Sequence, residues 1–214
     1  MTHTSCYRSP MRLRAHAFLW LLGAVVVSFF DGFHTHSGTT RYAAPVIWQM
    51  AWWTPLLFGG SVGLGGPIYA AGVRAIGGGR PPPSWRDLGI GFAIFGALYF
   101  ASGYLPASNG VKLAVLSCGA AVLFGWLDRT GAGAIMTLVT AVTGPLVEIT
   151  LVHLGVFAHL QPDFAGIPMW LPALYLCAGP TLGQIARRAL EAEVSARRPP
   201  SLGSVSPSET RAEA

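Results

Sequence analysis

Six long apolar runs divide this chain, and its basic residues gather in alternate gaps between them. Each run is close to the ~20 residues that a helix needs to cross the hydrocarbon core of a bilayer. Within that core only helices and closed barrels satisfy their own backbone. The pattern predicts an all-α, polytopic membrane protein, a bundle of six transmembrane helices. The runs span residues 15–33, 46–73, 88–105, 111–127, 133–157 and 167–186.

The basic residues also predict the orientation of the bundle. Twelve of the fourteen Lys and Arg residues lie before the first run or after the second, fourth or sixth. Loops rich in Lys and Arg stay in the cytoplasm, so both termini are predicted to be cytoplasmic. Arg41 and Lys112 are the basic residues of the other side. The strong preference for Arg favours a bacterial chain in the plasma membrane, and a eukaryotic one would lie in the endoplasmic reticulum.

Composition leaves no room for a separate soluble domain, because 52% of the 214 residues are hydrophobic and 11% are charged. We therefore expect one membrane domain, 15–190, between a cytoplasmic tail, 1–14, and a disordered cytoplasmic tail, 191–214. No internal repeat is evident. The net charge of +5 does not indicate nucleic-acid binding, because the arginines lie at helix ends and no basic face with aromatic residues appears. A secretory signal remains the alternative interpretation of the first run.

No sequence motif indicates catalysis. The chain has no HExxH, no GxSxG, no glycine-rich phosphate loop and no aspartate pair in adjacent runs. Its three cysteines show neither disulfide nor metal-ligand spacing. We therefore expect a protein that is not an enzyme and holds no metal. A lipid-modifying enzyme or a small permease remains the alternative function.

The fifth run carries an acid deep in the membrane. At 100° per residue, Thr140, Gly144 and Glu148 share one face, which should point into the bundle because lipid does not tolerate a carboxylate. Pro145 removes one helical hydrogen bond and should kink the helix there, exposing backbone groups. Kink and carboxyl together favour a partly polar cavity. The competing interpretation makes Glu148 a structural hydrogen-bond partner between helices and Pro145 an ordinary kink.

Four tracts together resemble the INSIG family, the six-span sterol-responsive regulators of the endoplasmic reticulum. The resemblance extends from about the first run to the end of the sixth. It implies a noncatalytic, lipid-dependent scaffold, because animal members retain the sterol sensor Scap and promote degradation of HMG-CoA reductase when sterol is abundant. The tracts are AWWTP at 51–55, GWLDRTGAG at 125–133, QPDF at 161–164 and WLPALYLCAGPTLGQIARRAL at 170–190.

The resemblance assigns a role to Asp128 and Arg129. They match the cytoplasmic Asp-Arg between the fourth and fifth spans of the family, where the aspartate supports the partner-binding conformation. Asp128 could equally pair with Arg129 or accept amides at the start of the fifth helix. The family's second arginine and its serines in this loop are replaced here by the residues 130–132. The animal partners therefore do not transfer, although a membrane protein partner stays possible.

An internal lipid cavity does transfer from the family. A bacterial ligand would be apolar with a small polar end, such as diacylglycerol, in place of a sterol. Glu148 or the backbone near Pro145 would then supply polar contacts, and Trp48, Phe29 and Phe100 would supply apolar walls. Small residues in the second run, Gly59 with Gly63 and Ser61 with Gly65, also permit a homo-oligomer.

Overall fold

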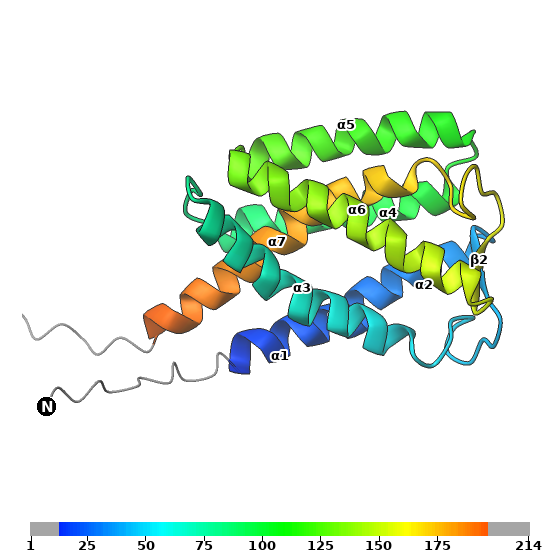
Figure 1. The fold of residues 1–214 in the computed structure, drawn as a ribbon, viewed down its shortest axis with the longest axis horizontal. Coiled ribbons are helices and arrows are strands. Elements are labelled where there is room, and N and C mark those ends of the chain that lie inside the picture. Colours follow the sequence, from blue (N-terminus) through cyan, green and yellow to red (C-terminus); the bar gives the residue numbers. More distant parts are fainter. Residues whose placement is uncertain (1–12, 197–214) are drawn as a thin grey trace, which may run out of the picture.

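Each apolar run forms a helix or consecutive helices in the computed structural model, which describes residues 13–196 (Figure 1). The predicted all-α bundle of six helices is confirmed. Five of its helices are long and apolar enough to cross a membrane. The elements are α1 (Leu13–Leu21), the π-helical turn η1 (Leu22–Val27), α2 (Ser28–His36), β1 (Thr40–Tyr42), α3 (Thr54–Ile76), α4 (Trp85–Tyr104), α5 (Asn109–Leu127), α6 (Gly131–His153), β2 (Phe157–His159) and α7 (Leu171–Ala196).

Helix α7 lies in the middle of the bundle and contacts α1, α3, α4, α5 and α6. It is long enough to span a membrane but is not among the five apolar spans, because its second half carries Gln184, Arg187 and Arg188. Gln184 and Arg187 are buried among neighbouring helices, so protein groups can satisfy them where lipid could not. The least apolar helix therefore takes the position that is best shielded from lipid.

Both ends of the described chain lie at one end of the bundle, which we call the terminal end (Figure 1). The opposite end holds β1 and β2 and is called the sheet end. Hydroxyl side chains fix the starts of three helices: Ser84, Ser108 and Thr130 accept hydrogen bonds from backbone amides in the first turns of α4, α5 and α6. These bonds satisfy amides that have no partner within a helix.

The glycines of α3 allow neighbouring helices to approach closely, as the sequence predicted. A Cβ atom at Gly59 would lie 2.8 Å from the ring of Trp20, and one at Gly63 would lie 3.2 Å from the Trp20 side chain. Ser61 and Gly65 are exposed on the other side of α3. The first pair therefore packs within the chain, and the second pair leaves a surface of small residues.

The structure contains a repeat that the sequence analysis missed. The end of α2, β1, a two-residue turn and the start of α3 recur at α6, β2, a second such turn and α7, at a constant shift of 117 residues (157 − 40, 171 − 54). Both turns use left-handed backbone, at Trp48 and Gln49 and again at Ala165 and Gly166, as type I′ turns require. Between residues 36 and 55, five pairs of identical residues mark the repeat: His36/His153, Gly38/Gly155, Pro45/Pro162, Trp53/Trp170 and Pro55/Pro172.

The two strands place this repeat on a local twofold axis. They pair antiparallel, with Arg41 opposite Ala158, and these residues are themselves 117 apart (158 − 41). Exchanging the two segments therefore maps the ladder onto itself. The strands tie the connection between the first two spans to the connection between the last two.

Several boundaries differ from those expected. The second run begins as a turn, and α3 starts only at Thr54, because left-handed residues interrupt the helix. The two short strands were not expected in an all-α chain. Helix α7 continues to Ala196, beyond the boundary expected at residue 190. The remaining tail residues, 1–12 and 197–214, lie outside the described residues.

Candidate functional site

Glu148 points into the bundle, as the polar stripe in the fifth run predicted. Its Oε2 atom lies 2.8 Å from Nε2 of His159 in β2, and its Oε1 accepts a hydrogen bond of 2.6 Å from the hydroxyl of Tyr175 in α7. Gly144 allows this arrangement, because a Cβ atom there would lie 2.1 Å from the Tyr175 ring. Both carboxyl oxygens of Glu148 therefore bond to protein groups.

The other two residues predicted beside Glu148 do not contact a ligand-sized space. Thr140 donates its hydroxyl proton to the carbonyl of Met136, one turn earlier in α6. Pro145 is buried within α6. Neither residue lines either of the cavities described below.

A second acid occupies the equivalent position in the repeat. Asp31 in α2 lies 117 residues before Glu148 (148 − 31) and is 4% exposed. Its Oδ2 accepts a hydrogen bond of 2.7 Å from Tyr42, the counterpart of His159. Burial, and then the Asp31 carboxyl, raise the pKa of Tyr42 well above its usual range, so this phenol stays protonated and donates. The sequence analysis did not single out Asp31, although its position inside the first apolar run was a signal of burial.

Further polar groups lie buried at the sheet end. The hydroxyl of Ser102 in α4 donates to the carbonyl of Tyr99, so the imidazole Nε2 of His34, 2.7 Å from the Ser102 oxygen, donates to it. Lys112 in α5 donates to the carbonyl of Ser102 over 2.8 Å. We call this group, together with the Asp31 and Glu148 pairs, the sheet-end polar cluster.

The QPDF tract, 161–164, fixes the position of the loop between β2 and α7 at the sheet end. Asp163 Oδ2 accepts hydrogen bonds of 2.8 Å from the Asn109 side chain and from the Met169 amide. The oxygen of Asn109 in turn accepts a bond of 3.0 Å from the indole of Trp170. The tract therefore joins the start of α5 to the start of α7.

Asp128 is the centre of a second polar network, at the terminal end. It follows α5, is 5% exposed and accepts hydrogen bonds from Tyr69 in α3, Gln184 in α7 and the amide of Thr130. Gln184 also accepts a bond from Arg187, whose guanidinium donates to the backbone of the α3–α4 loop. One carboxylate thus links α3 and the middle of α7 to the end of α5 and the start of α6.

Arg129 does not pair with Asp128. It is exposed, its backbone is left-handed with φ 62°, and its Nε donates to the carbonyl of Gly125. Of the local roles considered for Asp128, the structure shows the acceptance of an amide, from Thr130, before α6. Asp128 therefore shapes the loop, and Arg129 is the residue of the two that a partner could reach.

The predicted apolar walls form an aromatic row on the outer surface. Phe29 stacks on Trp48 with ring centroids 4.8 Å apart, and Phe33 connects this pair to Phe100. Phe100 stacks on Tyr104. The exposed fractions of Phe29, Trp48 and Phe100 are 49%, 42% and 46%. These three residues lie together on the outside of the bundle. None of them is among the hydrogen-bond partners of Glu148, which are His159 and Tyr175.

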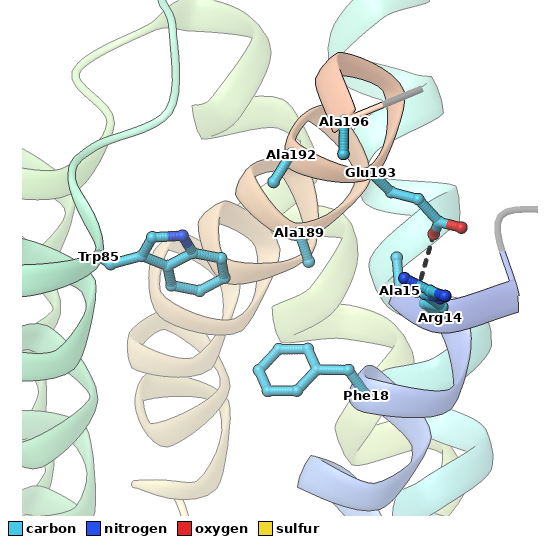
Figure 2. A pocket seen from close by; sticks show the side chains of 8 residues that line it. All are labelled: Arg14, Ala15, Phe18, Trp85, Ala189, Ala192, Glu193 and Ala196. Atoms are coloured by element: carbon cyan, nitrogen blue, oxygen red, sulfur yellow. Dashed lines mark hydrogen bonds between the residues drawn. The ribbon is translucent and has the colours of Figure 1, made fainter. Parts of the chain in front are cut away.

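One cavity lies at the terminal end between α1, α4 and α7. It measures about 630 Å³, and we call it the terminal-end cavity. Figure 2 shows Phe18 and Trp85 near each other on its wall, with Ala189, Ala192 and Ala196 of α7 beside them. Arg14 and Glu193 lie near each other at its rim. There the Glu193 carboxylate accepts a hydrogen bond from the backbone amide of Ala15. The cavity thus has aromatic and alanine walls and one charged edge.

A smaller cavity, the sheet-end cavity, measures about 440 Å³ and has mostly polar walls. Its lining includes Asn109, Lys112, His159 and Trp170. Neither cavity is built as a metal centre: within residues 13–196, no three His, Cys, Asp or Glu side chains come together to hold a metal ion.

Comparisons with known proteins give consistent relatives. No protein-family model matches the chain. The INSIG protein homologue of Mycolicibacterium vanbaalenii is 33% identical over 90% of this chain and 92% of its own length. The insulin-induced gene 1 protein of Danio rerio is 26% identical over 85% of this chain and 74% of its own length. The crystal structure of MvINS, a mycobacterial Insig homologue from Mycobacterium vanbaalenii, matches with a TM-score of 0.75 at 29% identity, over 88% of this chain and 97% of the other. A cross-linked MvINS trimer gives the same values.

Proposed function

The chain belongs to the INSIG family, and from this premise we propose that it is a noncatalytic, lipid-binding regulator or scaffold in a membrane. The observation that carries the proposal is the terminal-end cavity. Its volume of about 630 Å³ falls within the ~300–1,000 Å³ range of small-molecule sites. A ligand there would be apolar with a small polar end, such as diacylglycerol or a sterol.

The walls of this cavity support a lipid rather than a soluble metabolite. Phe18 and Trp85 meet edge to face with centroids 6.2 Å apart and are 43% and 45% exposed, so a ligand lying against both rings would cover apolar surface. Ala189 and Ala192 leave space along α7. Arg14 and Glu193 can bond a hydroxyl or ester group at the rim. Burying apolar surface contributes about 25 cal/mol per Å², so the aromatic walls would supply most of the affinity.

The proposal is tested by native mass spectrometry of protein purified in mild detergent, with fragmentation of the lipid that copurifies. We expect one neutral lipid per chain. Ala192→Trp fills the terminal-end cavity and should lower lipid occupancy several-fold. Val194→Trp, on the same helix but outside the cavity lining, is the matched control and should retain the lipid. Loosely bound phospholipids alone, or equal retention in both variants, would contradict the proposal.

A variant at Glu148 distinguishes two positions for the lipid. The sequence placed the polar end of the lipid at Glu148, whereas the terminal-end cavity does not include this residue. Glu148→Leu should weaken retention if the lipid reaches the carboxyl. Unchanged retention in a folded Glu148→Leu protein would assign the lipid to the terminal-end cavity alone.

We further propose a homo-oligomer and a protein partner. The same mass spectra report the oligomer, for which the cross-linked MvINS trimer makes a trimer the expected result. The exposed Ser61 and Gly65 of α3 allow close contact with another copy. Arg129, exposed beside the buried Asp128, offers a basic contact at the terminal end for a membrane protein partner.

A further inference from the structure

Lys112 is a buried cation with no acidic partner. It is 7% exposed, and its ammonium donates to the carbonyl of Ser102. Within residues 13–196, Lys112 forms no ion pair with a carboxylate oxygen within 4.0 Å. A buried charge costs several kcal/mol unless an opposite charge compensates it. The sheet end therefore lacks negative charge at this position.

The sheet-end cavity opens beside this ammonium. Lys112 and His159 are the charged or titratable side chains of its wall other than Tyr104, and no Asp or Glu side chain lines it. Asp163 bonds to Asn109 and Met169 and is outside the lining. The wall also includes Ser108 and Asn109 at the N-terminus of the 19-residue helix α5, where the helix dipole favours an anion.

His159 supplies an independent indication of a ligand. It is 6% exposed, and its Nδ1 atom is buried with no hydrogen-bond partner among the described residues. Its Nε2 bonds to the Glu148 carboxylate. This bond accounts for one ring nitrogen and leaves Nδ1 as a buried polar atom that no described group satisfies.

We propose that the sheet-end cavity binds an anionic oxygen-bearing group, a phosphate or a carboxylate, between the ammonium of Lys112 and Nδ1 of His159. The anion would accept a hydrogen bond from Lys112 and compensate its buried charge, and a ring N–H at Nδ1 of His159 would donate to the same anion. It can belong to a small solute or to a lipid headgroup. Tyr104 lines the cavity and also ends the surface row formed by Phe29, Phe33, Trp48 and Phe100, so an acyl chain could follow that row. The lipid proposed for the terminal-end cavity is a separate ligand at the other end of the bundle.

The test measures thermal unfolding of the full-length protein in neutral detergent, with inorganic phosphate or acetate against chloride at matched ionic strength. A ligand that binds the folded state raises the unfolding temperature. We expect phosphate or acetate to raise it for the wild type and for Arg41→Met, a control that removes an exposed charge at the sheet end outside the cavity. Lys112→Met should weaken binding by about 10- to 100-fold, the size of one charge-assisted hydrogen bond.

A second variant guards against misfolding of Lys112→Met. Ala107→Phe adds a ring to the cavity wall and leaves Lys112 in place, so it should also abolish the response. A parallel measurement compares nanodiscs of phosphatidylglycerol with nanodiscs of phosphatidylcholine. Stabilisation by phosphatidylglycerol alone assigns the anion to a lipid headgroup, and stabilisation by phosphate or acetate assigns it to a solute. No response of the wild type to any of these anions, or a response of wild-type size in both Lys112→Met and Ala107→Phe, would overturn the proposal.

Discussion

Asp128 and Gly133 form a pair of residues that each require the other. Asp128 accepts hydrogen bonds from three segments, and α6 can begin beside it only because residue 133 has no side chain. A Cβ atom at Gly133 would lie 1.9 Å from Oδ2 of Asp128. Gly131, two residues earlier in the same helix, has nothing within 4 Å of its Cβ position. The first turn of α6 therefore contains a constrained glycine and an unconstrained one.

Gly133→Ala should lower the stability of the protein by about 1–3 kcal/mol, as overpacking of a filled site does, because the methyl group displaces the Asp128 carboxylate from its donors. Gly131→Ala should be neutral or stabilising by up to about 1 kcal/mol, because alanine favours a helix more than glycine does. Thermal unfolding in detergent measures both. Equal effects of the two substitutions would show that the Asp128 network does not depend on this close approach.

The two sheet-end turns show the repeat at the level of elements. Each turn precedes a membrane helix by a few residues. Corresponding positions of the two turns both have left-handed backbone, with positive φ, but carry different residues. Gln49 has φ 63°, and its counterpart Gly166 has φ 79°. A Cβ atom at Gly166 would also lie 2.7 Å from Val152. Left-handed backbone costs a residue other than glycine about 1–2 kcal/mol.

Exchanging the residues between the turns tests the equivalence of their backbones. Gly166→Gln should destabilise the protein by at least about 1 kcal/mol, whereas Gln49→Gly should be neutral or slightly stabilising, because it relieves a left-handed glutamine. The unfolding temperatures of the two variants, measured side by side, check the prediction. A loss of stability in Gln49→Gly larger than that in Gly166→Gln would show that side-chain contacts, not backbone hand, control these turns.

At the scale of the whole molecule, the other helices surround α7 and keep its polar side chains away from lipid. The Asp128 network lies at one end of the bundle and the Asp31 and Glu148 pairs lie at the other. The orientation expected from the arginines would put the terminal end in the cytoplasm and the sheet-end cavity on the opposite side of the membrane. The two proposed sites would then face different compartments.

Cysteine labelling tests this orientation. In a protein with Cys6 and Cys118 replaced by serine, Ala44→Cys places an exposed thiol at the sheet end, and Pro81→Cys places one in the α3–α4 loop. A membrane-impermeant maleimide should label Ala44→Cys in intact cells and Pro81→Cys only after permeabilisation. The reverse pattern would contradict the cytoplasmic position of both termini.

Part of the candidate site could be predicted from the sequence, and part could not. The helical period placed Glu148 on the inner face of its helix, because an acid in a membrane helix has one tolerable direction. The same reasoning applies to Asp31, which lies near the end of the first apolar run and was not singled out. Trp48, Phe29 and Phe100 were expected in cavity walls, yet they lie in a surface row. Their apolar character suits lipid as well as a protein interior, so hydropathy does not separate the two environments.

The order of residues along the chain was enough to predict which segments become membrane helices and which end of the bundle carries the arginines. Both depend on the free energy of moving single residues or short runs from water into lipid. Residues that are neighbours along the chain determine this free energy. The tertiary structure decided that α7 is central, that β1 pairs with β2, and that Lys112 and His159 share a cavity. These contacts join residues far apart in the chain, and they depend on side-chain shape and on hydrogen bonds that form only when the helices pack.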